Sequence, residues 1–289
     1  MATPVRIRPP RRGAYILPSL FTVGNIFCGY FALTEAFKGA VAPEAAAQHM
    51  DAAAKAIGFA ILFDGFDGRI ARMTGTTSAF GREFDSLADA ITFGVAPALL
   101  AFVWGIRWLD PVSGGAMLEH LQRAGWFLGF LFVICGAARL ARFNITTDPV
   151  PANPGQPGRK YFVGLPIPAA AGLVAAVVHV VNGEPLFWWA WSVLWLTILL
   201  TAALLMVSRW RYYSFKDIDL RRRHPLFLVV SIAGLVAAIW FYSEPVLLCI
   251  AMSYAVSGVV TRAGGIVRRI FRRLHPRPLP PESDLTAGA

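Results

Sequence analysis

Four aspartates, arranged as two pairs, interrupt the hydrophobic part of this chain and are the side chains best suited to chemistry. Asp64 and Asp67 are three positions apart, and Asp85 and Asp89 are four apart. On a helix, either spacing places both carboxylates on one face. Carboxylates beside membrane-type sequence are costly unless a positive partner lies among them. Divalent Mg²⁺ or Mn²⁺ is the obvious partner, because such hard cations prefer carboxylate oxygens.

Two glycines and an arginine accompany the aspartates. Gly68 and Gly81 lack a Cβ, so the backbone can approach a bulky ligand closely at both positions. Arg72 follows Gly68 by four positions and could bind a phosphate with its forked guanidinium. Two facing helices with two aspartates each could hold two metal ions that clamp a diphosphate. One carboxylate must then accept a proton from an incoming hydroxyl, and Asp89, the last in the series, is the natural base.

The elements that position these residues are predicted to be membrane helices. The chain has 289 residues, is 56% hydrophobic and has a mean hydropathy of +0.54, values typical of a polytopic membrane protein. Its net charge of +10 is concentrated in residues 6–12, 209–223 and 262–277. Because these clusters flank apolar stretches, the positive-inside rule explains them better than nucleic-acid binding does. We therefore expect a lipid bilayer, and no nucleic acid, around this chain.

Apolar stretches long enough to cross a bilayer, about 20 residues each, recur along the whole sequence. We predict an all-α fold, a polytopic integral membrane helix bundle with about eight transmembrane helices. The predicted spans are 16–37, 52–72, 86–107, 124–142, 163–182, 186–207, 225–243 and 245–262.

The charges of the connecting loops predict the orientation. Weakly charged loops alternate with basic ones, so the basic loops, the aspartate motif and both termini are expected on the cytoplasmic side of the cell (inner) membrane. The predicted organisation is a basic N-terminus (1–14), one membrane domain (15–262) and a basic, then Pro-rich tail (263–289). The Pro-rich part is expected to be disordered.

Taken together, the aspartates and their neighbours form the pattern D-x2-D-G-x2-A-R-x8-G-x3-D-x3-D. Helix-end ion pairs with Arg69, Arg72 or Arg82 would explain single aspartates but not the complete pattern. The pattern resembles the signature of the CDP-alcohol phosphatidyltransferase family at all eight of its positions. The resemblance implies that an alcohol attacks the β-phosphate of a CDP-linked lipid and that CMP is released.

The same resemblance implies roles for individual residues. Two Mg²⁺ or Mn²⁺ ions would be bound by Asp64, Asp67, Asp85 and Asp89. Asp64 and Asp85 would bridge both ions, and Asp89 would also be the catalytic base. The stretch LPSLFTVGNIFCG matches a second family element at Pro18, Thr22 and Asn25, with Ser19 in place of the usual asparagine. Contacts to the CDP-lipid are expected from Ser19, Thr22, Asn25, Gly68, Arg72, Ser78 and Gly81.

Three further stretches bear on the acceptor alcohol. RLARFN (139–144), YFVGLPIPAAAG (161–172) and MVSRWRYYSFKD (206–217) resemble the serine-using branch of the family. This implies CDP-diacylglycerol and L-serine as substrates, and the family implies a homodimer. The candidate serine-binding residues are Arg139, Arg142, Asn144 and Lys160. Arg139 and Arg142 have a second interpretation, because arginines that end a span also anchor it among lipid headgroups.

Two other functions compete with serine transfer. A polyol phosphate acceptor, such as glycerol phosphate or inositol phosphate, would also require arginines near the site. An ion-coupled transporter would use intramembrane carboxylates, but it predicts charges near the bilayer midplane and not at one face. His179, which stands alone on an apolar span, is predicted to be a packed histidine and not a ligand.

Overall fold

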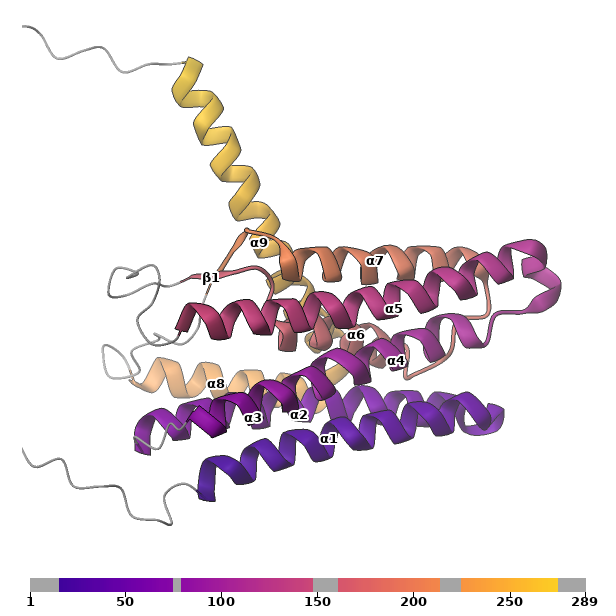
Figure 1. Cartoon of the computed structure of the whole chain (residues 1–289), viewed down its shortest axis with the longest axis horizontal. Coiled ribbons are helices and arrows are strands. Elements are labelled where there is room, and N and C mark those ends of the chain that lie inside the picture. Colours follow the sequence, from indigo (N-terminus) through magenta and orange to yellow (C-terminus); the bar gives the residue numbers. More distant parts are fainter. Residues whose placement is uncertain (1–15, 75–78, 148–160, 214–224, 275–289) are drawn as a thin grey trace, which may run out of the picture.

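The fold is a bundle of long helices that run side by side along one axis (Figure 1). The structure is a computed structural model that describes residues 16–74, 79–147, 161–213 and 225–274. Its first half contains α1 (Ile16–Val41), the short η2 (Pro43–Ala45), α2 (Ala46–Thr74), α3 (Ala79–Asp89), η3 (Ala90–Val95), α4 (Ala96–Phe102), η4 (Val103–Arg107) and α5 (Pro111–Thr147). Its second half contains β1 (Tyr161–Val163), α6 (Ile167–Val180), α7 (Trp189–Val207), β2 (Arg211–Tyr213), α8 (Pro225–Phe241) and α9 (Ser243–Leu274).

Helix length and composition confirm an all-α polytopic membrane protein. Within the described ranges, five segments are long and apolar enough to cross a membrane: Leu20–Val41, Phe80–Arg107, Met117–Ile145, Trp189–Val207 and Ser243–Gly264. The apolar helices Ile167–Val180 and Val229–Phe241 are shorter. α2 is long enough but carries part of the aspartate motif. Each of the eight predicted spans overlaps one of these helices.

The third predicted span is a helix that contains two stretches of π winding. α3 passes directly into the wide π turn η3 and then into α4, and a second π turn, η4, ends the span. Pro97, in the first turn of α4, has no N–H to donate to the carbonyl four residues earlier, so a break in regular α winding is expected here. η3 begins at the residue after Asp89, and π turns of this kind are frequent at functional sites.

Two short strands add a small sheet to the helical fold. β1 pairs antiparallel with β2, with Phe162 opposite Tyr212. The fifth predicted span, 163–182, therefore starts in a strand, and its helix begins only at Ile167. Pro166 caps α6 and Pro168 lies in its first turn, where the missing N–H costs no hydrogen bond. The prolines thus shape the entry to this span, as their positions predict.

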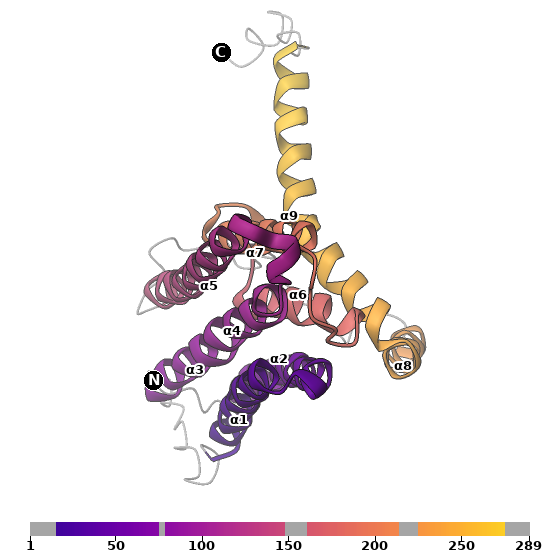
Figure 2. The same ribbon diagram turned by 90° about the vertical axis from the view of Figure 1, so that its right-hand side faces the viewer.

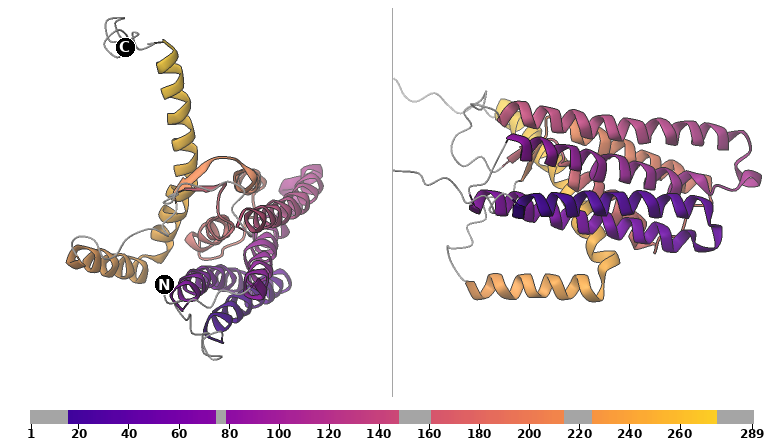
Figure 3. Two further views of the ribbon diagram at one scale, coloured as in Figure 1. Left: turned by 60° about the vertical axis from the view of Figure 1, so that its left-hand side comes forward. Right: turned by 60° about the horizontal axis from the view of Figure 1, so that its bottom comes forward.

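α8 and α9 form the outer part of the fold. Viewed along the helices, α8 lies apart from the other helices and is joined to them through α9 (Figure 2). Two further views show the same separation, and the end of α9 leaning away from the bundle (Figure 3). α9 continues to Leu274, through the boundary predicted after residue 262. Arg and Leu residues, which favour helix, follow that point, and the next proline in the sequence is Pro276.

The core depends on close contact between η4 and α7. Trp195 of α7 is 2% exposed, and its ring meets that of Trp104 edge to face at 4.9 Å between centroids. The Trp195 indole N–H donates to the carbonyl of Ala101 at 3.0 Å, and the Ser192 hydroxyl donates to the carbonyl of Gly105 at 2.7 Å. A Cβ at Gly105 would collide with the Trp195 ring, so only glycine permits this contact.

We predict that Gly105→Ala destabilises the protein by about 1–3 kcal/mol, because it overpacks a buried contact. The measurement is thermal unfolding of the purified protein in detergent. The matched control is Gly58→Ala on α2, where a Cβ meets nothing within 4 Å. The control should leave the melting temperature unchanged or raise it slightly, since alanine favours helix. Equal melting temperatures for both variants would contradict this packing account.

Candidate functional site

Three aspartates from two helices meet at one end of the bundle. Asp64 of α2 and Asp85 and Asp89 of α3 each place a carboxylate oxygen within 4.8 Å of the others. This is the end where α1 begins, α2 ends and α3 begins, at the left of Figure 1. Asp89 is 8% exposed, and the other two are half-buried. A set of three converging carboxylates suits a hard divalent cation, and it repels itself strongly without one.

α1 holds two of the four aspartates by hydrogen bonds. The Thr22 hydroxyl donates to Oδ2 of Asp67, which is buried and lies outside the three-aspartate cluster. Nδ2 of Asn25 donates to Oδ1 of Asp89 at 3.2 Å. Thr22 and Asn25 are three positions apart, so both side chains lie on one face of α1. From that face Thr22 reaches Asp67 on α2, and Asn25 reaches Asp89 on α3. The sequence predicted both residues as contacts of the CDP-lipid, and the structure gives them this second role.

A close approach between α1 and η3 makes the Asn25 contact possible. The Thr92 hydroxyl donates to the carbonyl of Asn25 at 3.1 Å. A Cβ at Gly29, one turn further along α1, would collide with the backbone of Thr92. The lack of a Cβ at Gly29 therefore lets α1 and η3 touch beside the aspartates. Thr92 and Gly29 thus contribute to the site indirectly, because they allow the close approach that positions Asn25. The sequence pattern alone did not identify them.

Arg139 of α5 supplies positive charge to the aspartate cluster. Its guanidinium interacts electrostatically with Asp89, with Tyr254 of α9 and with Asp64. The side chain is half-buried, and its Nε has no hydrogen-bond partner among the described residues. A buried guanidinium donor without a partner costs free energy unless a ligand or water satisfies it. Of the two interpretations that the sequence left open for Arg139, this position favours a role in the site.

The other predicted serine-binding residues differ in where they lie. Asn144 donates through Nδ2 to the Ser86 hydroxyl at 3.0 Å, which ties the end of α5 to α3 beside Asp85. Arg142 is exposed, as expected of an arginine that anchors a span at the membrane surface. Lys160 lies outside the described residues.

The remaining predicted contacts of the CDP-lipid are located only in part. Gly81 is half-buried in the first turn of α3. Ser19 is in α1, and Gly68 and Arg72 are in α2, but their side chains are not among those described. Ser78 falls in the gap between α2 and α3, outside the described residues.

A second buried polar network lies toward the opposite end of α2. His179 of α6 is 5% exposed, and its Nδ1 lies 2.5 Å from Oδ1 of Asp51. Its Nε2 lies 2.9 Å from the hydroxyl of Ser243, the first residue of α9. Lys55 pairs with the second oxygen of Asp51 at 2.6 Å. His179 is thus a packed histidine with satisfied nitrogens, as predicted, and the network joins α2, α6 and α9.

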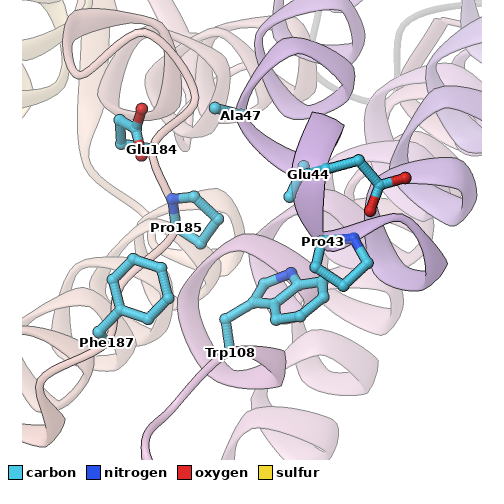
Figure 4. A pocket seen from close by; sticks show the side chains of 8 residues that line it. Pro43, Glu44, Ala47, Trp108, Glu184, Pro185 and Phe187 are labelled. Atoms are coloured by element: carbon cyan, nitrogen blue, oxygen red, sulfur yellow. The ribbon is translucent and has the colours of Figure 1, made fainter.

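A cavity of about 370 Å³ also lies at that opposite end. Its wall includes Pro43, Trp108 and Phe187, with the acidic residues Glu44 and Glu184 at its edge (Figure 4). Ala47, which also lines it, precedes Asp64 by 17 positions on α2, or about 25 Å of helix. The cavity is therefore separate from the aspartate cluster.

Comparison with known proteins assigns the chain to a family. The family model described as CDP-alcohol phosphatidyltransferase matches residues 15–207, which include the aspartate motif and all helices from α1 to α7. A match over this share of the sequence is sufficient to assign the family. The chain belongs to the CDP-alcohol phosphatidyltransferase family.

Three relatives illustrate the similarity. The chain is 37% identical over 223 residues to a Helicobacter pylori protein named CDP-diacylglycerol–serine O-phosphatidyltransferase, covering 77% of this chain and 81% of that protein. It is 34% identical over 246 residues to a Mycobacterium leprae protein of the same name, covering 80% and 70%. It is 34% identical over 162 residues to archaetidylserine synthase of Methanothermobacter thermautotrophicus, covering 55% and 56%.

We predict that Asp85→Asn and Asp89→Asn each weaken Mn²⁺ binding by roughly tenfold or more, because each removes a charged oxygen ligand from the cluster. Titration of the purified full-length protein, followed by the electron paramagnetic resonance signal of free Mn²⁺, measures this without any substrate. The matched control is Glu119→Gln on α5, an exposed acid that pairs with Arg123. Mn²⁺ affinities that are equal in all three variants and the wild type would rule out this cluster as the cation site.

Proposed function

We propose that this protein transfers a phosphatidyl group from CDP-diacylglycerol to the hydroxyl of L-serine and releases CMP. The observation that carries the proposal is the convergence of Asp64, Asp85 and Asp89 at one end of a membrane helix bundle. The serine-using names of relatives at 34–37% identity support the choice of acceptor. The archaeal relative, whose name also specifies a serine lipid, is consistent with that choice.

The aspartates would hold two Mg²⁺ or Mn²⁺ ions, with Asp67 as the fourth ligand. When bound, such ions neutralise a diphosphate and stabilise the charge that develops on the transferred phosphate. Asn25 and Thr22 keep Asp89 and Asp67 oriented through their hydrogen bonds. Asp67 lies outside the three-aspartate cluster, where it accepts the hydrogen bond from Thr22.

Asp89 is the proposed base of the reaction. It accepts the proton of the serine hydroxyl as the oxygen attacks the β-phosphate, and the bond to the CMP oxygen breaks. Asp89 is buried and receives a hydrogen bond at one oxygen only, from Asn25, among the contacts described. Water is thus limited around it, and its second oxygen is available to take the proton in this mechanism.

The location of the cluster suits two substrates that arrive from different phases. It lies at the end of the bundle, so a polar alcohol can reach it from water while the acyl chains of the donor stay in lipid. We place this end at the cytoplasmic face of the cell (inner) membrane, because α1 begins there and a cluster of basic residues, 6–12, precedes it in the sequence. The homodimer expected from the family resemblance remains a prediction.

We predict labelled phosphatidylserine and CMP when the purified protein is given CDP-diacylglycerol, Mn²⁺ or Mg²⁺ and labelled serine. A chelator should abolish the product, and Asp89→Asn should lower kcat by about 10²–10⁴-fold, the range for a lost general base. Glu44→Gln, at the far cavity, is the control that should retain activity.

The same assay separates the competing functions. Glycerol phosphate and inositol phosphate are tested in parallel, and inorganic phosphate is added as a competitor. A serine site should be nearly indifferent to phosphate. Product from a polyol phosphate, and none from serine, would support the phosphatidyl transfer but contradict serine as the acceptor. The absence of lipid product and CMP with every acceptor would contradict the proposed enzyme.

A further inference from the structure

The last turns of α9 leave the helix bundle. The Thr261 hydroxyl donates to the carbonyl of Arg211 in β2 at 3.2 Å, and residues 259–264 are all exposed. From there the helix continues to Leu274, which lies about 18 Å beyond Arg262. The family model ends at residue 207, so neither it nor the aspartate motif assigns a role to this segment.

Residues 262–274, which we call the α9 extension, carry charges of one sign only. Their sequence, RAGGIVRRIFRRL, contains five arginines, and no acidic residue occurs between Glu244 and Glu282. Apart from one alanine and two glycines, the remaining residues of the extension are large and apolar: Ile266, Val267, Ile270, Phe271 and Leu274. The extension is therefore both strongly basic and strongly apolar.

Helical winding separates these two kinds of residue. At 3.6 residues per turn, each residue advances about 100° around the helix axis. The large apolar residues then fall within an arc of about 140°. The five arginines fall within an arc of similar width on the opposite side, at positions 262, 268, 269, 272 and 273. The α9 extension is thus an amphipathic helix with an apolar face and an arginine face.

The direction of the α9 extension fits the surface of a membrane. Figure 2, which looks along the bundle, shows the last turns of α9 from the side, so they run across the bundle axis. In Figures 1 and 3 these turns lie near the end of the bundle where the aspartates meet. Because membrane helices cross the bilayer along the bundle axis, a helix that runs across this axis lies close to the plane of the membrane.

We propose that the α9 extension is an interfacial helix that binds anionic lipid: its apolar face enters the headgroup region and its arginine face binds lipid phosphates. Charge complementarity selects this partner, since five arginines without an acidic neighbour match the phosphates of anionic lipids. The apolar face requires hydrocarbon, which a membrane offers and a nucleic acid does not. The inference does not depend on the acceptor alcohol, although the proposed donor and product are themselves anionic lipids.

The test measures the depth of each face in the full-length protein. The native cysteines Cys28, Cys135 and Cys249 are replaced by alanine, and one spin label is attached at Ile270→Cys on the apolar face. The matched control is Gly265→Cys, which lies among the arginine positions and keeps every arginine. In nanodiscs of phosphatidylcholine with added phosphatidylglycerol, oxygen should relax the label at 270, because oxygen concentrates in lipid. A water-soluble nickel chelate should relax the label at 265.

A charge variant tests the choice of lipid. Four substitutions, Arg268→Gln, Arg269→Gln, Arg272→Gln and Arg273→Gln, are combined in the chain that is labelled at position 270. The phosphatidylglycerol content needed for half of the oxygen accessibility should rise by roughly tenfold or more, because four charges that attract anionic lipid are lost. Arg123→Gln, which changes an exposed arginine of α5, is the control that should leave this content unchanged.

Amide hydrogen exchange of the α9 extension in the wild type repeats the test without any substitution, and it should slow when phosphatidylglycerol is added. Nickel access at both labels, or oxygen access at both, would overturn the inference, because neither pattern is that of a helix at the interface. Identical label and exchange data with and without phosphatidylglycerol would also overturn it. Protection by an added oligonucleotide, and not by phosphatidylglycerol, would assign the arginine face to nucleic acid instead. None of these readouts involves turnover, so they are independent of the proposed serine transfer.

Discussion

The repulsion among three carboxylates is the constraint on which the rest of this structure depends. Two like charges about 4 Å apart repel by roughly 4 kcal/mol in surroundings typical of a protein surface. Asp64, Asp85 and Asp89 place oxygens within 4.8 Å of one another, and Asp89 is almost fully buried. Such a cluster persists only if the fold supplies hydrogen-bond donors, a positive side chain and a binding site for cations. The donors and the positive side chain come from helices other than those that carry the carboxylates.

The helices around the cluster divide these tasks. α1 contributes the donors, through Asn25 to Asp89 and Thr22 to Asp67. α5 contributes Arg139, which interacts electrostatically with Asp89 and Asp64. The core between η4 and α7 and the polar network around His179 lie farther away and keep these helices in register. The site is thus a property of the whole bundle, although its carboxylates come from one short motif.

The sequence predicted the membrane helices and the meeting of aspartates from two helices, because both depend on short-range patterns. Apolar runs identify spans, and the spacing of Asp85 and Asp89 is itself helical. The contacts among distant helices were not predictable in this way. Nothing in the local sequence shows that Thr22 faces Asp67 or that His179 joins Asp51 to Ser243. The last span, predicted to end at residue 262, agrees with the apolar segment Ser243–Gly264, but the sequence did not show that the helix continues to Leu274.

Anomalous X-ray scattering from crystals grown with Mn²⁺ tests the central claim most directly, because it locates the ion without reference to turnover. The account predicts an anomalous peak enclosed by the carboxylates of Asp64, Asp85 and Asp89. A saturating Mn²⁺ concentration that gives no peak there would contradict it. So would a peak only at another acidic place, such as the cavity edge with Glu44 and Glu184.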